Sequence, residues 1–380
     1  MSKINYFGYR IFKNKKNLYD SFFPNTKYNF DIRELKKFKK FKTIIIIGMG
    51  GSILGSKAIY SFLKHKIKKK IIFLDNLDQE LLSEVKKKNN LGKSLFVIIS
   101  KSGNTKETII NSSYFLPYLK KNNVIILSDD KKSILSEFAK KRNFKFIKHN
   151  KFIGGRYSVM SDVGMLPTFL MGLNPKTFKT DLVKIIKNRK IILNLNKQVN
   201  RFKNKKKGSL IFLNYIPELE NFLYWCQQLL SESLGKKGKG FIPVISNAPK
   251  DHHSLLQLYL DGPKDKFFYV FSTNFRKKLK TRTGVFGPKA NYLNNKNYED
   301  IKISQKEALL KVFKIKKIPF REITIKNFDE KTLGKLFLSF ILETILFSEK
   351  IKVNPYDQPA VEEVKILARN FLSLKKSSKK

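Results

Sequence analysis

Short apolar runs alternate with longer helical patterns along most of this chain, and this alternation constrains its fold more than any other feature. The first set of runs is rich in Ile, Val and Phe and covers residues 43–47, 70–74, 94–99, 123–127 and 144–147. Helical patterns of about 10 to 20 residues separate the runs. Continuous apolar runs of this length are typical of parallel strands that helices bury on both faces.

A second set of strand-like runs predicts a second sheet. These runs cover residues 209–213, 241–245, 267–271 and 320–325, again with helical patterns between them. The Lys- and Asn-rich stretch 175–207 lies between the two sets and has the pattern of a helical connector. We therefore expect the α/β fold class, with two α/β/α sandwich domains around central, mainly parallel sheets. The expected division is a first domain 1–174, the connector 175–207 and a second domain 208–380.

The charge of the chain raises the question of an anionic partner. Lys and Arg number 78 against 30 Asp and Glu among 380 residues, which gives a formal net charge of +48. Such an excess makes nucleic acid or an anionic membrane surface the first partners to consider. The lysines are spread along the whole chain with many Ile, Asn and Phe residues, which fits a codon bias toward A and T at least as well. We favour that interpretation and expect no specific nucleic acid and no membrane partner.

Three further observations indicate in which cellular compartment the protein is expected. Residues 1–16 contain no apolar core of a secretory signal, and the apolar stretch 336–347 is interrupted by Glu343, which predicts a buried helix rather than a membrane span. A single cysteine, Cys226, excludes an intramolecular disulfide and a cysteine-rich zinc site, and we expect it to be buried. A cytoplasmic protein is the prediction.

A glycine-rich turn follows the first predicted strand. Gly48, Gly50 and Gly51 precede Ser52, and a helical pattern begins near Leu54. Such a turn brings backbone N–H groups and the positive end of a helix dipole toward an anion. The spacing differs from the dinucleotide pattern G-x-G-x-x-G. Asp75, at the end of the second predicted strand, nevertheless leaves binding of a nicotinamide cofactor as an alternative. A tight connection without a ligand is an equally good interpretation of this turn alone.

The third predicted strand ends in a loop rich in hydroxyl groups. Ser100, Ser102, Thr105 and Thr108 surround Lys101 within nine residues. The carboxyl ends of strands are where open α/β sheets bind ligands. Hydroxyl donors and a lysine suit a phosphate monoester better than a carboxylate or a base. The alternative is that these residues only cap the next helix.

Further motifs follow the two loops in a fixed order. They are the segments 154–161 (GGRYSVMS), 231–236 (SESLGK), 251–254 (DHHS) with Gln257, and 354–362 (NPYDQPAVE) with Lys365. Together the six motifs resemble the phosphoglucose isomerase family, whose members have the sugar isomerase (SIS) fold. The resemblance covers residues 48–365. It implies reversible conversion of glucose 6-phosphate to fructose 6-phosphate through an enediolate, without a cofactor or a metal.

The resemblance also implies roles for individual residues. Glu232 matches the base that moves a proton between C1 and C2, and Arg156 matches the cation beside the enediolate. His253 matches a ring-opening histidine that reaches the site from the other subunit of a homodimer. Lys365 matches a lysine near the ring oxygen on a C-terminal helix that completes the site. The positions that match substrate-binding residues are Gly51, Ser52, Ser100, Lys101, Ser102, Thr105, Thr108 and Gln358.

The chemistry of the reaction explains these residue types. One carboxylate can remove the proton beside a carbonyl and return it to the adjacent carbon, which contributes roughly a hundred- to ten-thousand-fold. A fixed guanidinium stabilises the enediolate charge without a metal. Taken alone, a glutamate at a helix end such as Glu232 is more often solvated than catalytic. His252 and His253 are adjacent, so they are not expected to face the same site.

Two rival functions are weighed against this one. A dual phosphoglucose/phosphomannose isomerase on the same fold would convert mannose 6-phosphate at a comparable rate. A protein that binds sugar phosphates or nucleic acid without catalysis would account for the charge of +48. That rival gives no reason for the order in which Arg156, Glu232 and His253 occur.

Overall fold

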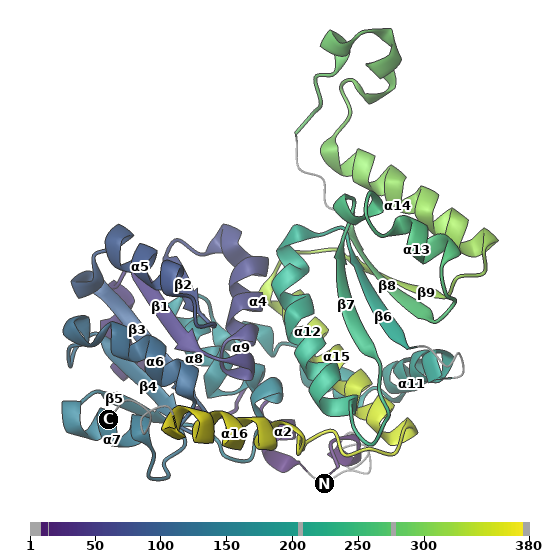
Figure 1. Cartoon of the computed structure of the whole chain (residues 1–380). Coiled ribbons are helices and arrows are strands. Elements are labelled where there is room, and N and C mark those ends of the chain that lie inside the picture. Colours follow the sequence, from purple (N-terminus) through teal and green to yellow (C-terminus); the bar gives the residue numbers. More distant parts are fainter. Residues whose placement is uncertain (1–8, 14, 204–207, 275–278, 375–380) are drawn as a thin grey trace.

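Two parallel sheets form the centre of the structure (Figure 1), a computed structural model that describes residues 9–13, 15–203, 208–274 and 279–374. The first sheet has the order β2-β1-β3-β4-β5 and the second has the order β7-β6-β8-β9, with every neighbouring pair parallel. The strands are β1 Thr43–Gly48, β2 Lys70–Leu74, β3 Ser94–Ser100, β4 Val124–Ser128, β5 Lys145–Lys148, β6 Ser209–Asn214, β7 Ile242–Asn247, β8 Lys266–Thr273 and β9 Phe320–Ile325. The predicted fold class is confirmed.

Helices bury both faces of the first sheet. Ile44 and Ile46 of β1 point into a core shared with one layer of helices, whereas Ile45 and Ile47 point into a separate core on the other face. This arrangement explains why the strand is continuously apolar in the sequence. The helices that contribute to the two cores are α4 Leu54–Leu63 and α8 Asp162–Leu170 on one side, and α5 Gln79–Lys88, α6 Lys106–Tyr114 and α7 Ile134–Arg142 on the other.

The two halves share one large core. Helix α12 (Glu220–Leu234) packs against α4 of the first half and against α15 (Glu330–Lys350). The predicted buried helix at 336–347 is part of α15, and its charged residue is accommodated: Glu343, 2% exposed, accepts hydrogen bonds from Arg321 Nη1 at 2.7 Å and from the Tyr269 hydroxyl. No described helix is long and apolar enough to cross a membrane.

The remaining helices lie at the edges of the two halves. The predicted helical connector contains three of them as far as residue 203. These helices are α2 Lys16–Asp20, α3 Ile32–Leu35, α9 Pro175–Phe178, α10 Leu182–Lys187, α11 Arg189–Lys203, α13 Leu256–Asp261, α14 Tyr298–Ile315 and α16 Val361–Leu374. The lysine-rich tail 375–380 lies outside the described residues.

The strand order places the two candidate loops side by side. The chain leaves β1 for β2 on one side and returns to β3 on the other, so the loops after β1 and β3 flank the point where the order reverses. Gly48 at the end of β1 pairs with Ile99 of β3. The glycine-rich turn and the hydroxyl-rich loop therefore begin next to each other.

One lysine in the connector is fully buried. Lys179 follows α9 with 0% exposure, and its Nζ lies 4.5 Å from the centroid of the Tyr28 ring without a hydrogen-bond partner among the described residues. Burial lowers the pKa of Lys179 to about 7, an effect that the charge of Asp162 partly opposes. In the unfolded chain this amine has an ordinary pKa of about 10.4.

This buried amine predicts a pH dependence of stability. Between about pH 7 and pH 10 the unfolded chain binds the extra proton, so the free energy of unfolding rises with pH. Lys179→Met removes this contribution. We expect the variant to be more stable at pH 7, with an advantage that shrinks by roughly 2 kcal/mol at pH 9. Urea unfolding of both proteins at pH 7 and pH 9 measures this difference. If the free energy of unfolding changed equally with pH in the two proteins, the lowered pKa of Lys179 would be contradicted.

Candidate active site

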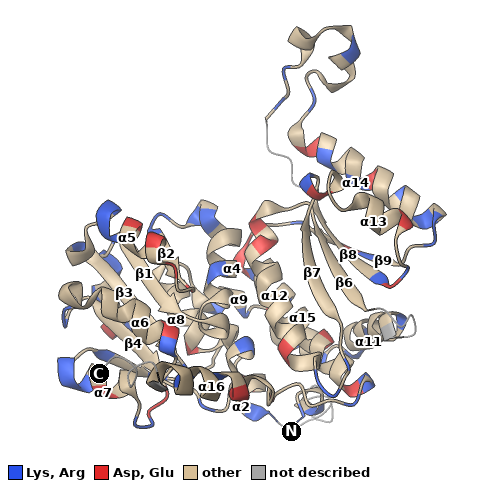
Figure 2. Cartoon of the chain, viewed as in Figure 1, with Lys and Arg blue, Asp and Glu red and all other residues tan. Residues whose placement is uncertain are grey.

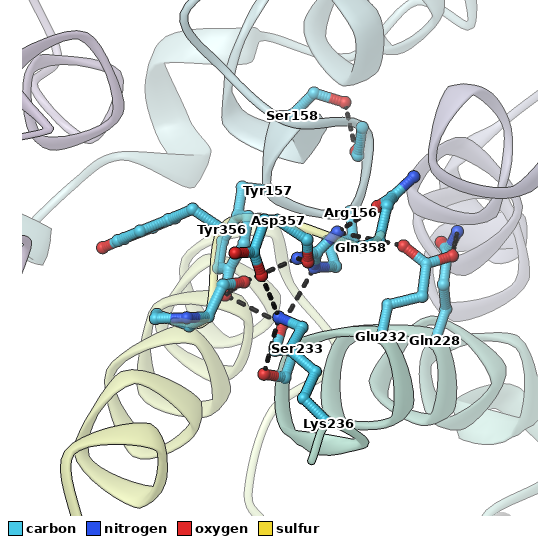
Figure 3. A network of polar contacts seen from close by, with 12 residues as sticks. Arg156, Tyr157, Ser158, Gln228, Glu232, Ser233, Lys236, Tyr356, Asp357 and Gln358 are labelled. Atoms are coloured by element: carbon cyan, nitrogen blue, oxygen red, sulfur yellow. Dashed lines mark hydrogen bonds and ion pairs between the residues drawn. The ribbon is translucent and has the colours of Figure 1, made fainter. Parts of the chain in front are cut away.

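Arg156 is the centre of a polar network that joins both halves of the chain (Figure 3). It lies in the 3-10 helix η6 (Gly155–Met160) and is 2% exposed. A guanidinium has five N–H donors, and here each has a partner. The acceptors are Ser233 Oγ at 2.8 Å from Nε, Glu232 Oε2 at 3.1 Å and Gln358 Oε1 from Nη1, and the carbonyls of Pro355 at 2.6 Å and Asp357 at 2.9 Å from Nη2.

Glycines let the backbone carry Arg156 to this position. A Cβ on Gly51 would lie 2.2 Å from the carbonyl carbon of Gly155, so the glycine-rich turn packs directly on the backbone of η6. Gly50 has φ +51°, a conformation that glycine adopts readily. The turn therefore serves close packing, and it also brings Ser52 of the 3-10 helix η2 (Gly50–Ser52) to the same edge of the sheet.

The Glu232 carboxylate is held in one orientation. It lies in the last turn of α12 with its side chain 30% exposed. One oxygen accepts from Arg156, and the other accepts from Gln228 Nε2 at 2.9 Å. Gln228 was not predicted as a site residue, although its position four residues before Glu232 places it on the same face of the helix. Glu232 is thus a fixed, reachable carboxylate.

Two further residues that the sequence analysis missed hold the segment 354–358 against Arg156. Lys236 Nζ forms an ion pair with Asp357 Oδ1 at 2.8 Å and donates to the Asn354 carbonyl. The Tyr157 hydroxyl lies 2.9 Å from Ser233 Oγ and donates to the Pro355 carbonyl at 3.1 Å. Both residues occur inside the motifs 154–161 and 231–236, so the motifs themselves could have identified them as site residues.

The hydroxyl groups after β3 do more than cap a helix. Thr105 occupies the N-cap of α6 without a side-chain capping bond, and its Oγ1 lies 2.8 Å from Ser100 Oγ instead. Thr108 is fully buried, and its hydroxyl has no hydrogen-bond partner among the described residues. Ser102 Oγ accepts from the Asn104 amide at 3.2 Å. Ser102 and Thr105 therefore offer hydroxyl groups at the start of a helix, where an anion can bind, whereas the Thr108 hydroxyl is closed off from solvent.

Lys101 connects this loop electrostatically to the Arg156 network. Burial lowers the pKa of Lys101, Asp129 opposes that effect, and the positive charge of Arg156 lowers the pKa further. A bound anion would relieve this repulsion.

His253 is exposed in the turn after the 3-10 helix η8 (Lys250–His252). Asp251 of η8 accepts from the Asn247 amide, and the Asn247 side chain donates to Glu220 at the start of α12. Glu232 follows Glu220 by twelve residues, roughly 18 Å along the helix, so His253 lies away from the network within the single chain. The neighbouring His252 points the other way, with Nε2 2.8 Å from the Tyr215 hydroxyl. The expectation that the two histidines face different surroundings fits this geometry.

The Lys365 amine forms an ion pair with Glu362 at 2.6 Å, and its side chain is 60% exposed. Its backbone carbonyl accepts from Lys106 Nζ at 3.2 Å, which places α16 against the start of α6. The helix thus lies beside the hydroxyl-rich loop, while the role of the Lys365 amine stays a prediction. Among the described residues, no group of three or more His, Cys, Asp or Glu side chains could hold a metal ion.

Two parallel sheets with a hydroxyl-rich loop at the carboxyl edge of the first define the class of the protein, the sugar isomerase (SIS) fold. Tagatose-6-phosphate ketose/aldose isomerase from Escherichia coli shares it with a TM-score of 0.57 at 12% identity, over 86% of this chain and 88% of that one. The chain belongs to the phosphoglucose isomerase family, whose family model matches residues 33–240. The resemblance to this family is confirmed, and the protein is a member of a family of isomerases.

Relatives of the chain match it over most of its length. Glucose-6-phosphate isomerase from Methanocaldococcus jannaschii is 32% identical over 356 residues, which cover 90% of this chain and 87% of that protein. The crystal structure of a glucose-6-phosphate isomerase from Chlamydia trachomatis has a TM-score of 0.75 at 20% identity, over 90% of this chain and 71% of that one.

Proposed function

We propose that this protein interconverts glucose 6-phosphate and fructose 6-phosphate, with Glu232 as the base. The observation that carries the proposal is the fixed Glu232 carboxylate, which accepts from both Arg156 and Gln228 close to the glycine-rich turn, where Gly50 packs against Gln228. A carboxylate that is oriented but still 30% exposed can reach a substrate proton. The family and the names of its relatives support the same reaction.

The phosphate group of the substrate would bind at the carboxyl edge of the first sheet. Donors come from the hydroxyls of Ser100, Ser102, Thr105 and Thr108, from the Lys101 ammonium and from the amino end of α6. Gly51 and Ser52 close the same site from the loop after β1. These groups match the three acceptor oxygens of a phosphate monoester.

The proton transfer would take place between this loop and α12. Glu232 removes the proton from C2 of the open-chain aldose, and the electron pair moves toward the C1 carbonyl oxygen to give an enediolate. Arg156, which cannot lose its proton, stabilises that charge together with Gln358. The proton on O2 then moves to O1, and return of the carbon-bound proton to C1 completes the ketose, so no oxidant or reductant is needed.

Ring opening requires an acid and a base, and we assign these to His253 and Lys365. His253 is exposed and distant from Glu232 in its own chain, which supports its use by a partner subunit in a homodimer. The hairpin 279–298, at the top of Figure 1, projects from the second half with Val285 86% and Phe286 77% exposed. Apolar side chains at the tip of such an arm suit burial against a second copy.

A coupled assay with fructose 6-phosphate in EDTA tests the proposal. We expect turnover by the wild type, and losses of at least about a hundred-fold in Glu232→Gln and in His253→Ala, because each removes a proton-transfer group. Glu363→Gln and His65→Ala change exposed residues of the same types and should retain activity. Absence of turnover in the folded wild type would overturn the assignment.

Co-expression of the two inactive variants tests the shared site. In a mixed dimer, the subunit with intact Glu232 receives the intact His253 of its partner, so one of the two sites is complete. Random pairing then restores about a quarter of the wild-type activity. No recovery in isolated mixed dimers would mean that His253 acts within its own chain.

A further inference from the structure

A basic groove lies on the edge of the first sheet opposite the candidate active site. It has a volume of about 770 Å³ and is lined by segments that precede β1, precede β4 and begin β5. In a parallel sheet these segments share the amino edge, whereas the sugar-phosphate loops follow the carboxyl ends of β1 and β3. Strands of five to seven residues separate the two edges by roughly 17 to 23 Å. The groove is therefore distinct from the site already described.

The groove is richer in lysine than the chain as a whole. Lys and Arg make up 78 of 380 residues, about a fifth, and Figure 2 shows them over both halves. Half of the ten residues that line the groove are lysines, and none is acidic. The five are Lys37, Lys40, Lys120, Lys121 and Lys145.

Most of these charges are left without an acidic partner. Lys145 forms an ion pair with Glu34, whereas no ion pair is formed by the other four among the described residues. Lys37 Nζ lies 5.4 Å from the centroid of the Phe38 ring. Several cations without acidic partners along one groove favour a ligand with several negative charges.

The aromatic rings at the groove decide between two kinds of polyanion. Single-stranded nucleic acids bind proteins by stacking bases on exposed aromatic side chains. Here Phe38 is 1% and Phe144 is 7% exposed, and Phe146 is partly buried against the core, so these rings form a floor rather than a stacking surface. A ligand that carries charge without bases fits the groove better. We propose that this groove binds a linear polyphosphate anion of three or more phosphate groups.

Binding of inorganic triphosphate, measured by isothermal titration calorimetry in metal-free buffer near physiological salt, tests the proposal. The groove variant combines Lys37→Gln, Lys120→Gln and Lys121→Gln. The control variant combines Lys311→Gln, Lys314→Gln and Lys316→Gln, which remove the same charge from an exposed part of α14 and its end. We expect binding to weaken at least about tenfold in the groove variant and less than about twofold in the control.

Several outcomes would overturn the proposal. Equal weakening in the two folded variants would mean that triphosphate responds only to the overall positive charge of the protein. No binding to the wild type would mean that the groove is not a triphosphate site. Displacement of triphosphate by glucose 6-phosphate would place the anion at the sugar-phosphate loops instead. A mixed-sequence single-stranded RNA that binds more tightly than a polyphosphate of equal charge would contradict the assigned ligand class. Long-chain polyphosphate that binds at least as tightly as triphosphate supports the proposal.

Discussion

The buried guanidinium of Arg156 is the interaction on which the rest of the site depends. A charge taken out of water is destabilising unless its donors are satisfied, and all five N–H groups of Arg156 have acceptors. These acceptors come from α12 and from the segment 354–358, whereas Arg156 itself follows the first sheet. Satisfying this one side chain therefore fixes how three distant parts of the chain meet.

The same arrangement explains why the site lies between the two halves. Glu232 ends a helix whose apolar side, with Trp225 and Cys226 at 1% and 0% exposure, packs in the shared core. The rigid helix thus places the Glu232 carboxylate beside the guanidinium. The contact between Gly51 and Gly155 brings the glycine-rich turn to the same place. Packing, rather than a flexible loop, sets the geometry of the carboxylate.

The sequence predicted the sheets because buried parallel strands are continuously apolar, and it predicted Arg156 and Glu232 because they occur in ordered motifs. It did not predict Gln228, Lys236 or Tyr157, since their roles arise from contacts between segments far apart in the chain. Gln358, for example, lies 202 residues from Arg156. The division at 174 and 207, the dimer and the roles of the site residues, with Glu232 and Arg156 among them, stay predictions, because the structure of one chain alone does not test them.

Transfer of a solvent-exchangeable proton by Glu232 is the central claim of this account. The most direct measurement is the conversion of glucose 6-phosphate in D₂O, followed by NMR. Because the Glu232 side chain is 30% exposed, the proton that it removes can exchange with solvent before it is returned. The account predicts deuterium at C1 of the fructose 6-phosphate formed. Full turnover without deuterium at that carbon would contradict it, since hydrogen would then pass directly from C2 to C1.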